Sequence, residues 1–490
     1  MTLRDILSLA LATFALAANA AVTKPNIVYI LADDLGWTDL GCQGSQYYET
    51  PSIDRLAAQG LRLMRYYNSQ NCAPTRAVLM SGQYAPRTGI YTVNTLERGE
   101  ARDRRMNVPP NATKLPLDKF ILPQALKAAG YATGLFGKWH LGNEGDYHPA
   151  KRGFDEAIVQ DGKHFDFVTT PRVEYPKGQY YADFLTDRAV DFIARHRDQP
   201  FFLYVTHFAV HTPIEAKAEY VAKWERKPPR GTHWNPTYAA MIQSVDESVG
   251  RIGAKLDELG LTANTVVIFS SDNGGLGGYQ RTEPPSAKKG FTDNAPLRGG
   301  KGTLYEGGLR VPFIVRWPGV VRPGATSEVP LAHIDLYPTL VDIAGGKPKP
   351  GYPLDGVSFL SVLRDPAAVV VAREAIYWHF PGYLESYVHA RGWRTAPVGA
   401  IHAGDWKLLE FLETGTVELY NVRADLGETR NLAAESPEKA QVLRAKLADW
   451  RRQIGAAMPT MKTAEELAAG MAAEPKAERQ GRKKQKASRP

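Results

Sequence analysis

Cysteine is scarce in this chain of 490 residues, which contains only Cys42 and Cys72. Two cysteines exclude a fold held together by a framework of disulfides. One bridge between them stays open as an alternative, although the residues around Cys72 favour chemistry at that position.

Long apolar runs are missing except near the N-terminus. Arg4 precedes an apolar run over residues 6–18 that ends in the small-residue triplet Ala18-Asn19-Ala20, the pattern of a secretory signal peptide. A membrane anchor is the alternative, but the run is shorter than the roughly 20 residues that span a bilayer. We expect residues 1–20 to be a signal peptide and the protein to be periplasmic or secreted, with no integral membrane segment.

Most of the chain has no large excess of positive or negative charge, although the formal net charge is +8. Residues 475–490 hold seven Lys or Arg against one Glu, so this tail contributes +6 and everything before it only +2. Such a terminal run is typical of a solvated, disordered end, and adhesion to an acidic surface is the less favoured interpretation. We expect no nucleic-acid partner and no catalytic role for the tail.

Apolar, β-branched runs alternate with helical patterns, which predicts an α/β fold with a mostly parallel central sheet flanked by helices. The predicted strands are residues 27–32, 132–136, 201–206, 265–270 and 311–316. The predicted helices between them are residues 123–129, with a proline start and a glycine stop, and residues 238–259, with one apolar face. We find no internal repeat.

The pattern changes after Gly356, where shorter elements follow. They are a helix near residues 359–363, a break around Pro366, a hairpin of residues 406–411 and 417–421, and a helix over residues 437–454. We predict a large domain over residues 21–365, a smaller C-terminal α+β domain with an antiparallel sheet over 366–468, and a basic tail over 469–490.

Charged or imidazole side chains follow four of the predicted strands. They are Asp33-Asp34, Lys138-Trp139-His140, the pair His207 and His211, and Asp272-Asn273. Because open α/β sheets bind ligands at the carboxyl ends of their strands, we expect these groups to meet in one site. A structural ion-pair network is the alternative.

Two of these strand ends offer only oxygen ligands. Asp33, Asp34, Asp272 and Asn273 supply carboxylates and a carboxamide, which suit calcium or magnesium rather than zinc. An Asp pair alone is often a turn or a helix cap. The Asp-Asn-Gly-Gly sequence after an apolar strand favours the metal site, because it places compact ligands on a permissive turn.

Cys72 is predicted to lie at a helix N-terminus, because Pro74 suits a first helical turn and Gly82 a helix end. Backbone N–H groups and the helix dipole favour an anion there. An unmodified thiol would be a nucleophile or simply a small buried residue, and taken alone the second is commoner.

Several blocks resemble the sulfatase family, in the family's order, over about residues 24–450. Cys72-Ala73-Pro74-Thr75-Arg76 resembles the signature whose cysteine is oxidised to formylglycine, with Thr75 where many members carry serine. The other blocks are residues 26–34 with Gly36-Trp37, residues 137–142, residues 271–274, and residues 300–302 through 305–308. The chain is similar to arylsulfatase-like, formylglycine-dependent type I sulfatases of the alkaline phosphatase superfamily.

The resemblance implies an alkaline-phosphatase-like sheet domain with a small C-terminal domain. It implies one calcium ion held by Asp33, Asp34, residue 72, Asp272 and Asn273, and a formylglycine-generating maturation enzyme as a partner. A hydrated aldehyde has two hydroxyls: the metal lowers the pKa of one, which attacks sulfur, and the other later loses its proton so that sulfate is expelled. A serine could form the sulfated enzyme but could not eliminate sulfate in this way.

Matching positions take further roles from the family. Arg76 would orient the hydrate, Lys138 and His140 would hold the hydrate and sulfate oxygens, and Lys301 would bind sulfate near the leaving oxygen. His211 matches the histidine that protonates or hydrogen-bonds the leaving group. We place His207 on the substrate side as well.

A charge count favours an anionic substrate. Three carboxylates and a divalent cation sum to −1, and Arg76, Lys138 and Lys301 bring the site to +2. The count does not separate a sulfate from a phosphate ester, so the cysteine motif decides. The alternatives are a phosphomonoester or phosphonate hydrolase of the same superfamily, and a non-catalytic binder of sulfated glycans.

The stretch from Trp378 to Arg394 is rich in aromatic and basic residues without a clear helical or strand period. It contains Trp378, His379, Phe380, Tyr383, Tyr387, His389, Arg391, Trp393 and Arg394. These residues either fasten the small domain to the large one or rim the pocket, with flat faces for sugar rings and cations for further anionic groups. We therefore expect a sulfated carbohydrate rather than a small aryl sulfate as substrate, with Trp393 and Arg394 among its contacts.

Overall fold

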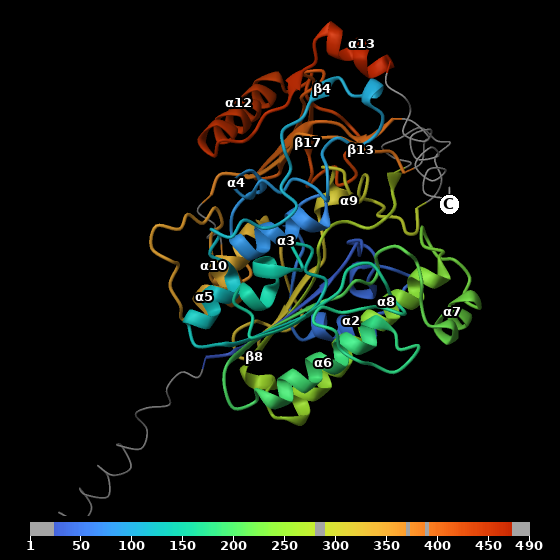
Figure 1. Cartoon of the computed structure of the whole chain (residues 1–490), viewed down its shortest axis with the longest axis vertical. Helices are drawn as coiled ribbons and strands as arrows, with labels where there is room; N and C mark the ends of the chain where they lie inside the picture. The colour runs from blue at the N-terminus through green and yellow to red at the C-terminus, as the bar shows by residue number, and fades with distance from the viewer. Residues whose placement is uncertain (1–23, 280–289, 369–372, 388–391, 473–490) are drawn as a thin grey trace, which may run out of the picture.

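The computed structural model describes residues 24–279, 290–368, 373–387 and 392–472. The predicted signal peptide, His389, Arg391 and residues 473–490 lie outside the described residues. A large sheet domain forms the body of the molecule, and the C-terminal part of the chain caps one end of it (Figure 1). Within the described ranges, no helix is both long and apolar enough to cross a membrane.

The body is built on an eight-stranded sheet, which confirms the predicted mostly parallel architecture. In spatial order its strands are β10 (Ala325–Ser327), β2 (Leu61–Leu63), β9 (Phe313–Arg316), β8 (Thr265–Ser271), β1 (Asn26–Ala32), β7 (Phe201–Thr206), β5 (Ala132–Gly137) and β6 (Glu156–Val159). Strand β9 runs antiparallel to β8 and β2, and the other neighbouring pairs are parallel. All seven residues of β1 are buried, as expected for a strand covered on both faces.

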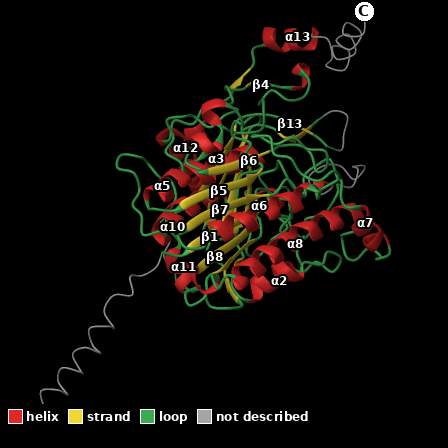
Figure 2. Ribbon diagram, turned by 60° about the horizontal axis from the view of Figure 1, so that its bottom comes forward, coloured by secondary structure: helices red, strands yellow, loops and turns green. Residues whose placement is uncertain are grey.

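Helices cover both faces of this sheet. Figure 2 shows α3 (Cys72–Ser81), α5 (Leu122–Ala128), α10 (Leu336–Ile343) and α11 (Leu360–Arg364) on one side of the strands. On the other side lie α2 (Pro51–Ala58), α6 (Tyr181–Arg195) and α8 (Pro236–Glu258), with α7 (Ala218–Glu225) packed on α8. Alternate side chains of β1 pack on opposite faces of the sheet. Tyr29 and Leu31 belong to one core, and Val28 and Ile30 belong to the other.

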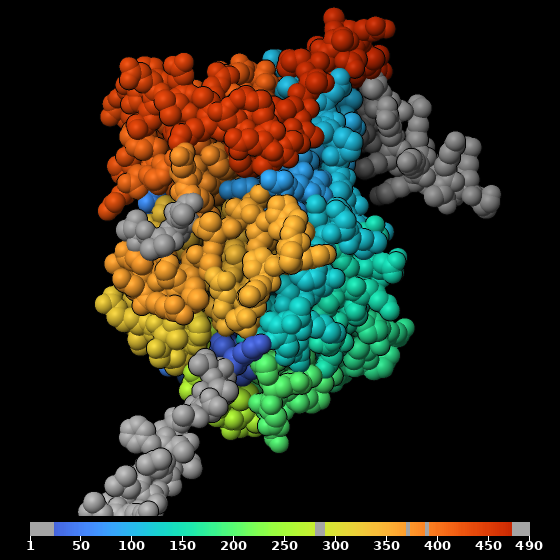
Figure 3. Space-filling model, turned by 90° about the vertical axis from the view of Figure 1, so that its left-hand side faces the viewer, coloured from blue at the N-terminus to red at the C-terminus, as the bar shows by residue number. Residues whose placement is uncertain are grey.

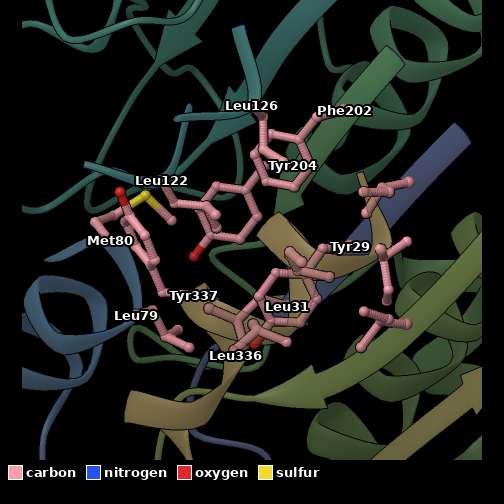
Figure 4. Close-up of a cluster of buried hydrophobic side chains, with 14 of the residues drawn as sticks. Tyr29, Leu31, Leu79, Met80, Leu122, Leu126, Phe202, Tyr204, Leu336 and Tyr337 are labelled. Atoms are coloured by element: carbon pink, nitrogen blue, oxygen red, sulfur yellow. The ribbon is translucent and has the colours of Figure 1, made fainter. Parts of the chain in front are cut away.

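The core under α3 and α5 ties helix α3 to the sheet. Tyr29 stacks on Tyr204 of β7 with ring centroids 5.3 Å apart, and Leu126 and Tyr337 pack in the same cluster (Figure 4). Met80 of α3 joins this cluster and is 1% exposed. Burying each such side chain contributes about 1.5–3 kcal/mol, so the start of α3 is held in a fixed position relative to the strand ends.

The C-terminal part of the chain forms a smaller antiparallel sheet. Its strands, in spatial order, are β12 (Ile376–Phe380), β15 (Val398–Ala403), β16 (Trp406–Phe411) and β17 (Val417–Asn421), and helix α12 (Pro437–Gln453) packs on it. Figure 3 shows this part, in orange-red and red, as a layer across one end of the body. The predicted hairpin is confirmed at β16 and β17, and the predicted terminal helix at α12.

Short elements complete the fold. They are α4 (Ala85–Thr88), α9 (Glu306–Leu309), α13 (Ala464–Ala472), the pair β3 (Tyr66–Tyr67) and β11 (Leu331–Ala332), the pair β4 (Met106–Asn107) and β18 (Thr460–Met461), and the pair β13 (Leu384–Glu385) and β14 (Trp393–Thr395). Helix α13 continues four residues past 468, where we expected the folded part to end, because its alanines have high helix propensity. The predicted domain boundary near 366 falls between α11 and β12.

Regular structure also occurs where the sequence pattern showed none. Trp378, His379 and Phe380 belong to β12, and Trp393 and Arg394 to β14. Strand β12 lacks the alternation of a half-exposed strand because four of its five residues are buried. Its pairing with β15 therefore had no signature in the sequence.

Candidate active site

The carboxyl ends of β1 and β8 bring the predicted oxygen ligands together. Asp33 and Asp34 follow β1, and Asp272 and Asn273 follow β8, which pairs with β1 in parallel. All four side chains are fully buried. The backbone N–H of Asp34 donates to Asp272 Oδ1 at 3.1 Å, and Asn273 Nδ2 donates to Asp34 Oδ1 at 2.8 Å. Asp34 also has a left-handed φ of 63°, an uncommon conformation that is enriched at functional sites.

Cys72 is the first residue of α3, as predicted, and its thiol faces the carboxylates. The Sγ atom lies 3.4 Å from Asp33 Oδ1 and 4.0 Å from Asp34 Oδ1. Burial, and then the negative charge of Asp33, raise the pKa of this thiol well above its usual value. The unmodified thiol is therefore protonated at neutral pH and a poor nucleophile. Cys42 and Cys72 are both free, so the alternative of a bridge between them is wrong.

Three buried cations surround the carboxylates. Lys138 contacts Asp33, Lys301 Nζ lies 2.7 Å from Asp34 Oδ2, and Arg76 Nη2 lies 2.9 Å from Asp272 Oδ2. Burial disfavours the charge on Lys301, but Asp34 outweighs that effect and the pKa of Lys301 is well above its usual value. The pKa of Lys138 is raised too, because Asp33 outweighs its burial. Both lysines are therefore charged.

The residues around Cys72 fit a hard divalent cation. Asn273 Oδ1 is buried and accepts no hydrogen bond within the described part of the chain. Burial, together with the charge of Asp33, raises the pKa of Asp272 to about 7, so its ionised form needs further positive charge. Ligand atoms of Asp33, Asp34, Cys72 and His211 lie within 4.8 Å of one another. The carboxylate oxygens of Asp33, Asp34 and Asp272 and the carboxamide oxygen of Asn273 are ligands that suit calcium.

Only part of the predicted ligand set forms this close group. Asp272 Oδ2 is engaged by Arg76, and Asn273 Nδ2 points at Asp34. His211, which we did not expect as a ligand, brings its Nε2 within 3.7 Å of Asp34 Oδ2.

A cavity of about 310 Å³ opens onto Cys72. Its lining residues are Asn71, Cys72, Val93, Arg98, Lys138, His140, Asp161, Gly162, Phe208, His211, Thr212, Leu276, Lys301, Tyr387 and Arg394. Cationic and imidazole groups outnumber the single carboxylate of Asp161 in this set. The pocket is therefore built for an anion.

Comparison with known proteins decides the family. The Sulfatase family model matches residues 25–346, and the N-sulphoglucosamine sulphohydrolase C-terminal model matches residues 300–453. A sulfatase of Formosa agariphila is 36% identical, over 85% of this chain and 86% of that protein. The chain belongs to the sulfatase family.

Two further relatives agree with this assignment. N-acetylgalactosamine-6-sulfatase of Mus musculus is 35% identical to the sulfatase described here, over 73% of this chain and 69% of that protein. The solved structure of Ps i-CgsB in complex with k-i-k-neocarrahexaose superposes with a TM-score of 0.72 at 28% identity, covering 93% of this chain and 99% of that one. The alkaline-phosphatase-like fold and the sulfatase activity follow from these matches.

Two histidines of the sulfatase face the pocket in neutral form. Burial, followed by the charge of Lys301, lowers the pKa of His211 to about 4. Its Nδ1 lies 2.5 Å from the carbonyl oxygen of Thr212 and donates to it, so Nε2 is left on the pocket side. Burial and Lys138 hold the pKa of His140 well below its usual value, and His140 has a left-handed φ of 61°.

Two residues expected to contact substrate are not among those that line the pocket. His207 is fully buried away from the pocket, with Nε2 3.1 Å from Ser248 Oγ of α8, because it directly continues β7 and points to the opposite layer. Trp393 does not line the pocket but packs on Tyr383 with ring centroids 4.6 Å apart. Trp393 therefore fits the structural alternative, in which these aromatic residues fasten the small domain to the large one. Its neighbour Arg394 lines the pocket.

The sequence interpretation missed several residues of the site. Arg98 and Phe208 line the pocket from loops, and His164 Nε2 lies 2.9 Å from the carbonyl oxygen of His211. The family blocks did not include these positions. A signal existed only for Phe208, which stands between the two predicted histidines of the β7 strand end.

Proposed function

We propose that this sulfatase hydrolyses sulfate monoesters of carbohydrates with a formylglycine made from Cys72 and a calcium ion held by Asp33, Asp34, Asp272 and Asn273. One observation carries the proposal: the Cys72 Sγ lies within 4.0 Å of two buried aspartates, in a pocket that Lys138 and Lys301 also line. The names of two relatives, which refer to N-acetylgalactosamine 6-sulfate and to a neocarrahexaose complex, support a carbohydrate substrate.

Several side chains at the site have a part in this reaction. Lys138, Lys301 and His140 bind the sulfate oxygens, and Arg76 orients the nucleophile from its position beside Asp272. The hydrated aldehyde would supply one hydroxyl that attacks sulfur and a second whose deprotonation expels sulfate. A calcium ion would supply positive charge that polarises the ester and lowers the pKa of the attacking hydroxyl.

His211 is the proposed donor to the leaving group. Because its Nδ1 proton is given to Thr212, Nε2 is an acceptor while the ring is neutral. A bound sulfate ester adds negative charge and raises the pKa of His211, so Nε2 takes up a proton and delivers it to the leaving alkoxide.

The experiment combines mass spectrometry with kinetics on the active protein. We expect the Cys72 peptide to have lost its sulfur, and kcat/KM to be higher for 6-sulfated N-acetylgalactosamine or sulfated galactan oligosaccharides than for nitrophenyl sulfate. Unmodified Cys72 in an active sample would overturn the formylglycine part of the proposal. A preference for nitrophenyl phosphate would favour a phosphomonoester hydrolase, and tight glycan binding without any turnover would favour a passive binder.

Export and maturation belong to the same proposal. The apolar run after Arg4 supports cleavage of residues 1–20 and release to the periplasm or the medium. N-terminal sequencing of the exported protein should begin at Ala21. Coexpression with a formylglycine-generating enzyme should raise the active fraction.

A further inference from the structure

Arg394 enters the active-site pocket without a carboxylate partner among the described residues. Its side chain is 8% exposed, and its Nε and Nη1 atoms have no hydrogen-bond partner among the described residues. The guanidinium lies over the ring of Tyr387, 3.7 Å from the centroid. Gly302 makes room for it, since a Cβ at that position would lie 2.6 Å from Arg394 Nε. The fold therefore holds this cation in place at the cost of its hydration.

Arg98 lines the same pocket and adds a second guanidinium. Its Nη2 donates to the carbonyl oxygen of Val93 at 2.7 Å. Burial and then the positive charge of Arg394 lower the pKa of Arg98, so the two cations are close enough to repel each other. In the described ranges neither arginine has a carboxylate oxygen within 4.0 Å.

The acidic groups that the structure describes nearby do not neutralise the pair. Asp161 lines the pocket, but its Oδ2 accepts a hydrogen bond from Asn143 at 2.6 Å. Glu385 stabilises the charged form of Arg98 at longer range and is exposed. Nearer Cys72, three aspartates are matched by three cations. Arg98 and Arg394 therefore add positive charge that one sulfate ester does not neutralise.

We propose that Arg98 and Arg394 form a second anion site, which binds an anionic group of the substrate that is not cleaved. This inference rests on the proposed function and narrows its substrate class to sugars that carry a sulfate or a carboxylate besides the sulfate that is removed. A planar guanidinium forms paired hydrogen bonds to either group. Tyr387 presents the flat face on which Arg394 is held.

The test compares kcat/KM for four substrates: nitrophenyl sulfate, a monosulfated neutral sugar, its disulfated form, and a monosulfated sugar linked to a uronate. We expect wild type to prefer the disulfated or the uronate-linked compound, and that choice identifies the second anion. In Arg98→Ala and Arg394→Ala, kcat/KM for the preferred compound should fall by about 100-fold, at least tenfold more than for nitrophenyl sulfate. Arg102→Ala, an exposed arginine outside the pocket, should change neither value.

Several outcomes would overturn the inference. Equal losses on all four substrates would mean that the arginines act on the cleaved sulfate, and a wild type indifferent to the second anion would remove the need for a site. If Arg394→Ala fails to fold, Arg98→Ala and Arg394→Lys, which keeps the charge but loses the paired geometry, carry the comparison. If wild type cleaves none of the esters, the proposed function fails. Calorimetric titration with the disulfated and monosulfated sugars then tests the second anion site by itself. Equal affinities for the two sugars would rule out the site.

Discussion

Cys72 occupies a site that holds a small side chain, and the proposed mechanism needs two hydroxyls there rather than one. It is 1% exposed and touches two aspartates, so Cys72→Ser fits without rearrangement. We predict that this variant loses at least about 1,000-fold in kcat while its Tm stays within about 2 °C of wild type, because serine lacks the second hydroxyl. Steady-state hydrolysis of nitrophenyl sulfate and a thermal melt check both parts.

Cys42 provides the matched control. It is a half-buried free cysteine outside the pocket, and Cys42→Ser should retain wild-type kcat. Sustained turnover by Cys72→Ser at the wild-type rate would rule out the proposed nucleophile.

At this scale, the sequence indicated residues that follow strands and missed residues that reach the pocket from loops. Asp33, Lys138 and Asp272 were predictable because parallel strands deliver their ends to one edge. Arg98 was not, since its loop has no periodic pattern. His207 was misplaced because neighbouring positions at a strand end point to opposite layers, and only the structure shows which layer holds the pocket.

The end of β5 positions Lys138 through a glycine. Gly137 has a φ of 125°, and a Cβ there would lie 1.9 Å from the carbonyl oxygen of Thr206 on β7. Gly137→Ala must separate the two strands and displace Lys138. We predict a loss of about 3 kcal/mol in the free energy of unfolding and at least a tenfold fall in kcat/KM.

Gly253→Ala is the control for that change. Gly253 lies within α8, and an added Cβ would meet no atom within 4 Å. Alanine should therefore stabilise the helix, by up to about 1 kcal/mol. Denaturant unfolding and kinetics on both variants make the comparison. A Gly137→Ala protein as stable and active as Gly253→Ala would show that the strand end tolerates the displacement.

A buried charge cluster joins α9 to the smaller sheet. Lys407 of β16 lies 3.0 Å from Glu306 Oε1 and 2.9 Å from Glu428 Oε1. Although burial disfavours its charge, Lys407 and Arg310 lower the pKa of Glu306 to about 2. Burial raises the pKa of Glu428 to about 7, with Glu306 adding to the effect and Lys407 opposing it.

The two carboxyls make opposite contributions to stability against pH. Glu306 has a lowered folded pKa, so its contribution is present above the unfolded value of 4.5 and lost as pH falls through about 2. Glu428 has a raised folded pKa, so its contribution is present below 4.5 and lost as pH rises through about 7. Of these two carboxyls, only Glu428 changes its contribution to stability between about pH 5 and pH 8.

Glu428→Gln should remove this dependence. The quantity to measure is the Tm of Glu428→Gln minus the Tm of wild type. We predict that this difference is about 2–5 °C more positive at pH 8 than at pH 5, because glutamine does not ionise. Glu374→Gln, at an exposed ion pair with Lys446, should show a constant difference. A constant difference for Glu428→Gln as well would mean that Glu428 does not titrate in this range.

Helices and strands were predicted correctly from the sequence where a single local feature explained the pattern. The hairpin of β16 and β17 was predicted at its observed bounds because Gly415 marks a turn between two apolar runs. Helix α6 was not predicted, although its buried residues recur at helical spacing, and its buried face packs against α8 as well as against β5 and β7. Strand β9 begins two residues later than expected because Pro312 has no N–H to give to the sheet.

For the whole molecule, removal of the proposed calcium should affect activity and stability together. Asp33, Asp34 and Asp272 are fully buried and drawn from distant parts of the chain, so an ion that they share links those parts. Chelation should abolish turnover. The Tm of the chelated protein should be about 5 °C lower than that of protein in calcium at about 100 times Kd. Calcium added back should restore both more fully than magnesium, and a metal-free sample with unchanged melting and activity would contradict the assignment.

The burial of Cys72 also sets an order of events during synthesis. Cys72 emerges early, yet Asp272 and Lys301 are made about 200 residues later, and Trp378 of β12 donates its indole N–H to the carbonyl oxygen of Asn68 at 2.9 Å. Once these segments have closed around α3, an enzyme can no longer reach the thiol. The proposed conversion of Cys72 would therefore have to happen on the growing or still unfolded chain, and under that proposal a molecule that folds first stays inactive however well it folds.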